Sequence, residues 1–127
     1  LVEKFPEQPF VLDHLAKPLI KDRRMQPWAA DIRRLAEFPT VCCKVSGMIT
    51  EADWRQWQPA DFQPYLEVVF EAFGPQWLMF GSDWTVCTLA GSYAEVVNLL
   101  ADYTRSLSTT EQAAVWGQTA RTFYSLD

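Results

Sequence analysis

The feature that most constrains this chain is the alternation of short apolar runs with longer amphipathic segments. Three runs match buried strands, which are nearly continuous in apolar residues; they are Phe10 to His14, Thr40 to Ser46 and Leu78 to Ser82. The segments between and after them carry apolar residues at helical spacing. The resulting order of strand, helix, strand, helix, strand, helix, helix predicts an α/β fold, with a parallel sheet and right-handed crossovers.

Helix boundaries are marked by proline, glycine and capping residues. Pro27 suits the start of the first helix and Pro39 closes it, while Gly74-Pro75 stops the second. Ser108-Thr109-Thr110-Glu111 is a capping-box pattern that opens the last helix. The predicted helices are Trp28 to Phe38, Asp61 to Phe73, about 92 to 104, and 108 to Tyr124.

With 127 residues the chain is predicted to form one domain. Three strands do not close a barrel, and a complete eight-stranded (β/α)₈ barrel takes about 250 residues. Two architectures therefore stay open, a small open α/β domain or the end of a larger barrel. Because the first residue is Leu1 rather than methionine, we expect a processed or truncated product.

Charge and composition exclude several classes of function. The net charge is −5 and no basic run is present, so we expect no nucleic-acid partner. No apolar run approaches the ~18–20 residues that span a bilayer, so no membrane association is expected. The three cysteines include the adjacent pair Cys42 and Cys43, which would point to opposite faces of a strand; this usage favours a reduced, cytoplasmic setting.

Two ionisable residues stand where predicted strands end. Asp83 follows the third apolar run, and His14, the single histidine, ends the first. The carboxyl ends of strands are where α/β barrels place their chemistry. Asp83 could act as a general base on water, or could cap the following turn. His14 could polarise a carbonyl, move a proton or bind a metal; alternatively, it is a buried histidine bonded to the backbone.

Strand alternation predicts one shared polar face for these residues. Asp13 would then point away from His14 and bond to backbone or to a helix terminus, and Val11 would face the helices. The residues predicted to share the inner face are Phe10, Leu12, His14, Cys42, Lys44, Ser46, Met79, Gly81 and Asp83.

Other side chains are candidates for substrate binding. Lys17 and Lys44 could attract an anionic or hydroxylated substrate, or could be ordinary surface lysines. Trp84, with Trp54 and Trp57, could form an aromatic wall for a sugar ring, although such residues often cap a core. A nucleophilic role for Cys87 would need a base that the sequence does not identify. Ser46 and Ser82 likewise have no basic residue beside them in sequence. One histidine and one aspartate are too few for a zinc site.

Four segments together resemble the amidohydrolase-related (β/α)₈ barrels, most of all the metal-dependent-hydrolase-like branch that includes fuconolactonases and rhamnonolactonases. They are Val11 to Pro18, Lys44 to Met48, Phe80 to Trp84, and Gly117 to Tyr124. The first three look like the ends of the sixth, seventh and eighth strands of that barrel, and the fourth like its final helix. The resemblance covers the chain from about Pro9 to Leu126.

This resemblance implies that residues 1–127 form a single partial domain, the C-terminal portion of a hydrolase barrel. Asp83 matches the acid that activates the hydrolytic water, and His14 matches the sixth-strand histidine that binds metal or substrate. If one divalent metal such as zinc is used, His14 and Asp83 are its ligands here and the others lie outside the chain. The family's His-x-His pair and fifth-strand histidine have no counterpart, so we expect little activity from the isolated chain. Thr85 stands where relatives often have proline.

Three hypotheses follow for function. In the first, the parent protein hydrolyses a sugar lactone or similar cyclic ester, and its partner is a small lactone or carbohydrate-derived substrate. In the second, the chain is a non-catalytic partial barrel that self-associates as a homo-oligomer through its open strand edges. In the third, it is a small α/β binding module complete in itself.

Overall fold

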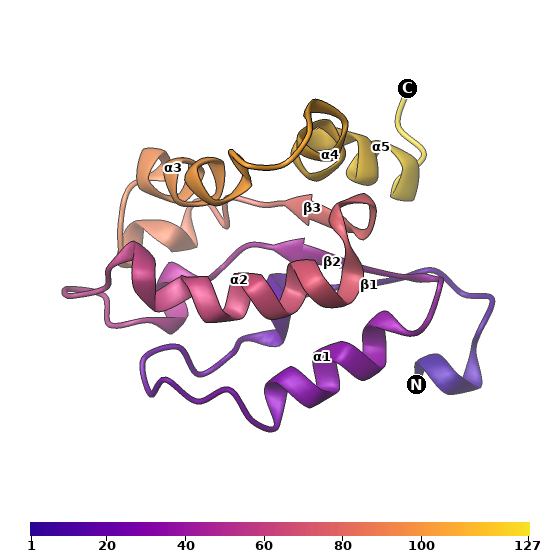
Figure 1. The fold of residues 1–127 in the computed structure, drawn as a ribbon, viewed down its shortest axis with the longest axis horizontal. Coiled ribbons are helices and arrows are strands. Elements are labelled where there is room, and N and C mark those ends of the chain that lie inside the picture. The colour runs from indigo at the N-terminus through magenta and orange to yellow at the C-terminus, as the bar shows by residue number, and fades with distance from the viewer.

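A computed structural model describes all residues from 1 to 127 and confirms the predicted α/β order (Figure 1). Each strand is shorter than the apolar run that predicted it, because the run continues into the loop that carries the site. The elements are β1 (Phe10–Leu12), α1 (Trp28–Ala36), β2 (Val41–Val45), α2 (Pro59–Phe73), β3 (Leu78–Phe80), α3 (Tyr93–Thr104), α4 (Thr109–Ala113) and α5 (Thr119–Phe123).

The three strands form one parallel sheet in the order β1-β2-β3. Val11 lies opposite Cys42, and Lys44 lies opposite Met79. Parallel neighbours need a crossover connection, and α1 and α2 supply the two crossovers. In Figure 1, α1 and α2 lie below the strands, and α3 to α5 lie above them beside β3. Strands and helices together have the architecture of a partial (β/α)₈ barrel, as predicted.

One face of the sheet packs into the main hydrophobic core. Cys43 and Leu78 are fully buried there, with Leu12 partly buried beside them. The predicted placement of Phe10 and Leu12 on the inner face is therefore wrong. Both pack against the core, and the register puts Val11 on the inner face with Cys42 and Lys44.

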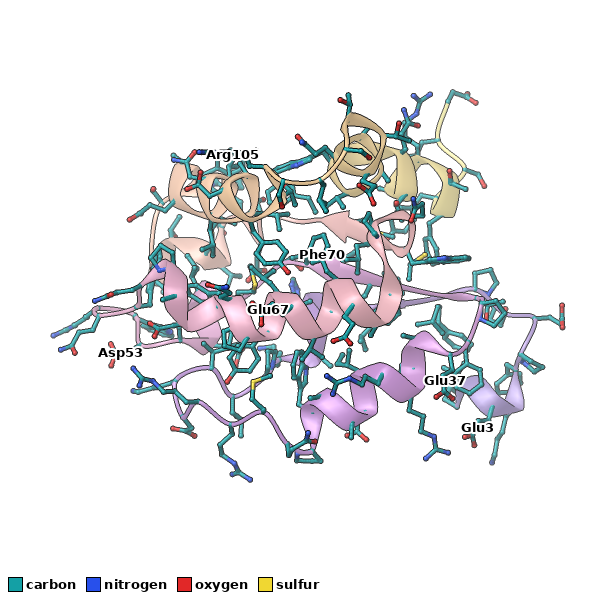
Figure 2. All side chains as sticks on the ribbon, in the orientation of Figure 1. Glu3, Glu37, Asp53, Glu67, Phe70 and Arg105 are labelled. Carbon is teal, nitrogen blue, oxygen red and sulfur yellow. The ribbon has the colours of Figure 1, made fainter.

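The helices reach the sheet and one another largely through aromatic side chains. Phe70 points from α2 toward α3 (Figure 2), and its ring centroid lies 4.9 Å from that of Tyr103. Phe80 of β3 packs on Trp116 at 4.6 Å. None of the helices is long and apolar enough to cross a bilayer.

The predicted last helix is capped as expected but is not uniform. Ser108 Oγ accepts a hydrogen bond from the backbone N–H of Glu111, whose carboxylate accepts one from the N–H of Ser108, so the predicted capping box is confirmed. Between α4 and α5, residues Ala114–Gln118 form a wider π-helical turn. Val115 in this turn is part of the core, and its neighbour Trp116 packs against it.

The first strand ends at Leu12 because the backbone then turns left-handed. His14, Leu15, Ala16 and Lys17 all have positive φ, between 47° and 56°. Such a conformation costs roughly 1–2 kcal/mol per residue for L-amino acids. Leu15 anchors the turn: its side chain is fully buried and its carbonyl accepts a 2.6 Å hydrogen bond from the indole N–H of Trp28. Core packing thus holds the turn in place.

We expect Leu15→Ala to lower the free energy of unfolding by about 2–5 kcal/mol, because it leaves a cavity beneath the left-handed turn. Urea denaturation followed by circular dichroism measures the change. Leu19→Ala is the matched control, since Leu19 is nearly half exposed and its truncation should cost less than about 0.5 kcal/mol. Similar losses for the two variants would contradict the anchoring role of Leu15.

Candidate active site at the carboxyl ends of the strands

The two residues singled out from the sequence meet at the carboxyl end of the sheet. Nε2 of His14 lies 3.7 Å from Oδ1 of Asp83. His14 sits in the left-handed turn after β1, and Asp83 follows β3 with a φ of 55°. Both side chains are partly shielded, with exposed fractions of 29% and 15%. Positive φ at non-glycine residues often marks functional sites, because surrounding structure must hold the strain.

Ser46 and two carboxylates fix the orientation of the His14 ring. The Ser46 hydroxyl lies 2.8 Å from Nδ1, while Nε2 faces Asp83 and, at 3.2 Å, Oδ2 of Asp13. Carboxylates only accept hydrogen bonds, so Nε2 carries a proton here. In the neutral ring the Ser46 hydroxyl then donates to Nδ1. The fold thus supplies Ser46 with a basic neighbour that is distant in sequence.

Asp13 is part of this cluster, contrary to expectation. Its carboxylate bridges two side chains, with Oδ2 near Nε2 of His14 and Oδ1 3.3 Å from Nζ of Lys44. The prediction that Asp13 points away from His14 assumed that both belong to one strand. The strand instead ends before them, so Asp13 continues the inner face of Val11 and the turn brings His14 to the same place.

Lys44 is held by this pairing. Burial lowers the pKa of Lys44, but hydrogen bonds to Tyr124 and Asp13, together with their charges, outweigh burial and leave that pKa above its ordinary value. The ammonium group also lies 6.0 Å from the centre of the Tyr124 ring. Lys44 is therefore positively charged at neutral pH and bound to Asp13.

Two glycines make room for the cluster. A Cβ on Gly47 would lie 3.0 Å from both Cβ and Nδ1 of His14, and Gly47 itself has a φ of +63°. A Cβ on Gly81 would lie 2.9 Å from Cβ of Ser46, closer than real Cβ contacts. The close approach of Gly47 to His14 and of Gly81 to Ser46 therefore depends on the absence of side chains at these positions.

A cavity of about 380 Å³ opens above the pair, a size suited to a small organic molecule. His14 and Asp83 line it, and so does Lys17, whose ammonium is 3.2 Å from Oε1 of Glu51. The other lining residues are Gly47, Thr50, Trp54, Val86 and Leu89.

The remaining predicted binding residues lie outside this cavity. Trp84 has 67% of its surface exposed and does not line the cavity, and neither does Lys44, whose ammonium group pairs with Asp13. Trp57 is structural, since its indole N–H donates to the carbonyl of Ala90 at 2.8 Å and its ring packs edge-on against Phe62. Of the aromatic residues, Trp54 alone lines the cavity.

A family model described as Amidohydrolase matches residues 1–126. The chain belongs to the amidohydrolase family. The resemblance found in the sequence motifs is confirmed by this match.

Two curated relatives of this chain are lactonases from Burkholderia species. An L-fucono-1,5-lactonase of Burkholderia multivorans is 46% identical over 91% of this chain, and one of Burkholderia ambifaria is 36% identical over 98%. The aligned part is 43% and 44% of those proteins, so the chain spans less than half the length of the curated relatives it matches.

Among solved structures, an amidohydrolase from Burkholderia multivorans with bound zinc superposes with a TM-score of 0.90 at 43% identity. That match covers 99% of this chain and 48% of the other. The three strands described here are thus similar to about half of that protein.

Within this chain, no group of three or more His, Cys, Asp or Glu side chains is arranged to hold a metal ion. His14 and Asp83 nevertheless offer two donor atoms 3.7 Å apart, close enough to share an ion with bonds of about 2.0–2.2 Å. Catalytic zinc takes about three protein ligands, so these two residues fit part of such a site.

Sequence reasoning missed two members of this site, Asp13 and Glu51. Asp13 adjoins His14 in sequence, which could have flagged it, but strand alternation argued the opposite. Glu51 lies on a short helical turn, Ile49–Glu51, and only the fold brings it to Lys17.

We expect Gly47→Ala to displace the His14 ring and to destabilise the chain by about 1–3 kcal/mol, because the new methyl group meets the ring at a strained backbone position. The ¹H–¹⁵N resonances of the imidazole and urea denaturation report these effects. Gly117→Ala is the control, because a Cβ there meets nothing within 4 Å. An unshifted imidazole in Gly47→Ala would contradict this account.

A second expectation concerns the thiols. Burial raises the pKa of Cys42 and Cys87, and that of Cys43 to about 12, so all three should be protonated at pH 8. The folded chain should react with an aromatic disulfide reagent far more slowly than the chain unfolded in guanidinium chloride. The unfolded chain should release three equivalents of the reagent's coloured thiolate, one for each cysteine. A fast-reacting thiol in the folded chain would contradict the protonated, buried state of these cysteines.

Proposed function

We propose that this chain carries the water-activating part of a hydrolase that opens sugar lactones. The observation that carries the proposal is the Asp83–His14 pair at the base of a ligand-sized cavity. The similarity of the chain to two L-fucono-1,5-lactonases supports a six-membered sugar lactone as the substrate class.

Asp83 is the general base of the proposed reaction. Its carboxylate takes a proton from a water molecule as that water attacks the lactone carbonyl carbon. The tetrahedral intermediate then collapses, the bond between the carbonyl carbon and the ring oxygen breaks, and Asp83 returns the proton to the leaving oxygen. The products are the hydroxyl group and the carboxylic acid of the opened chain.

His14 supports this step as a hydrogen-bond donor. Its Nε2–H faces the same space as the Asp83 carboxylate and can donate to the carbonyl oxygen, where negative charge develops. Ser46 holds the opposite side of the ring, which keeps the proton on Nε2. Asp13 and Lys44 affect His14 indirectly. Lys44 offsets the charge of Asp13, which limits how strongly the Asp13 carboxylate competes with the substrate carbonyl for the Nε2–H.

A divalent metal such as zinc fits this proposal in part. His14, with Nε2 free of its proton, and Asp83 would be its ligands in this chain, with further ligands supplied from elsewhere. The ion would then take the place of the Nε2–H donor. When bound, such an ion polarises a carbonyl and lowers the pKa of a water molecule.

Lys17 and Trp84 are proposed to contact the substrate at different distances from the reacting carbonyl. Lys17 lines the cavity and lies within reach of ring hydroxyls. Trp84 follows Asp83 directly and is highly exposed, so its ring is available to cover the substrate from the cavity mouth.

The test is a chimera in which this chain replaces the matching segment of the Burkholderia multivorans L-fucono-1,5-lactonase. We expect the chimera to hydrolyse L-fucono-1,5-lactone. The acid that hydrolysis releases is measured with a pH indicator. Asp83→Asn should lower kcat/KM by about 10²–10⁴-fold, because the general base is lost.

Asp102→Asn is the matched control, since Asp102 is exposed on α3 and pairs only with Arg105. It should leave kcat/KM unchanged. Full activity in the Asp83→Asn chimera would overturn the role of Asp83. A folded chimera that hydrolyses no lactone would overturn the proposed reaction.

A further inference from the structure

Three of the residues that line the cavity have complementary chemistry. Glu51, Lys17 and Trp54 all line it. The Glu51 side chain is only 20% exposed, and one of its oxygens, Oε1, faces the Lys17 ammonium at 3.2 Å. Its second oxygen has no hydrogen-bond donor or cation among the contacts of the chain, so a carboxylate oxygen is left to accept from a ligand.

This carboxylate is held rigidly relative to the reacting pair. The turn Ile49–Glu51 is anchored by the buried Ile49 side chain, and Thr50 Oγ1 donates to the carbonyl of Gly47 at 3.0 Å. Gly47 in turn abuts the His14 ring. The distance between Glu51 and His14 is therefore set by a short, packed segment.

Trp54 provides an apolar surface beside the carboxylate. Half of its surface is exposed, yet its indole N–H donates to the carbonyl of Thr50 at 2.8 Å, which fixes the ring on the same turn. An aromatic ring beside a carboxylate and an ammonium group suits a sugar ring, whose C–H face is apolar and whose edge carries hydroxyl groups.

We propose that Glu51, Lys17 and Trp54 form a subsite that binds neighbouring hydroxyl groups of a polyhydroxylated lactone ring. Glu51 accepts hydrogen bonds from two hydroxyls, Lys17 donates to one of them, and Trp54 packs on the ring. The subsite selects sugar lactones over cyclic esters without hydroxyl groups. This assignment rests on the proposed lactone hydrolysis, for which it specifies the substrate.

Binding to the chain itself tests the subsite without catalysis. The probes are a six-membered polyhydroxylated lactam, a stable analogue of a sugar 1,5-lactone, and δ-valerolactam, which has the same ring without hydroxyls. Dissociation constants come from ¹H–¹⁵N NMR titrations, in which the indole N–H of Trp54 reports on the site. We expect the polyhydroxylated lactam to bind at least about tenfold tighter than δ-valerolactam, since hydrogen bonds to a charged group contribute about 1.5–3 kcal/mol.

Glu51→Gln keeps the shape of the side chain and removes its charge. It should reduce that preference by about tenfold while leaving the affinity for δ-valerolactam unchanged. Glu37→Gln is the control, because Glu37 lies at the end of α1, at the opposite end of the molecule from Asp53, the neighbour of Trp54 (Figure 2). Lys17→Met should weaken the preference less than Glu51→Gln, because its ammonium is largely exposed.

An unchanged preference in Glu51→Gln, or equal affinity of the unaltered chain for both lactams, would overturn the subsite. The outcome is separable from that of the hydrolysis experiment. If Glu51→Gln loses the preference for the polyhydroxylated lactam, the subsite is supported even if Asp83→Asn leaves hydrolysis intact. If Glu51→Gln keeps the preference and Asp83→Asn loses activity, the subsite is overturned while Asp83 is retained as the base.

Discussion

The left-handed turn after β1 is the constraint on which the rest of the site depends. Four successive residues with positive φ cost several kcal/mol, and none of them is glycine. Burial of Leu15 and the hydrogen bond from Trp28 offset this cost. Because the turn is held from the core side, His14 projects to the opposite side, where Asp13 and Asp83 meet it. The same packing that stabilises the fold therefore positions the ring.

The sequence was sufficient to predict the element order and the parallel sheet, because buried strands and amphipathic helices have different periodicities. Alternation also placed Lys44 and Cys42 on one face of β2, away from Cys43, and the register agrees. The same rule failed for Phe10 and Leu12. It assumed that the strand extends to His14, and the signal for a left-handed backbone in Asp13-His14-Leu15-Ala16-Lys17 is weak, since glycine and asparagine are absent and only Asp13 and His14 are of types that favour positive φ.

The sequence was sufficient to pick out candidate site residues, but not to predict which of them contact one another. Asp83 and His14 stood out because ionisable groups rarely follow buried strands without a reason. Their mutual distance, the hydrogen bond from Ser46 and the pairing of Glu51 with Lys17 depend on how loops from separate strands converge. Sequence spacing carries no information on such contacts. Trp84 shows the converse, because a residue next to Asp83 in sequence is not among those that line the cavity.

His14 and Asp83 follow the two outer strands of the sheet, while Ser46 and Gly47 follow the strand between them. Contacts between such distant parts of the chain form only after both crossovers have closed, and closing long loops is slow. A partly folded chain with only one strand pair would lack the cluster entirely. The proximity of these two side chains therefore reports on completion of folding, since it requires both outer strands to be paired with β2.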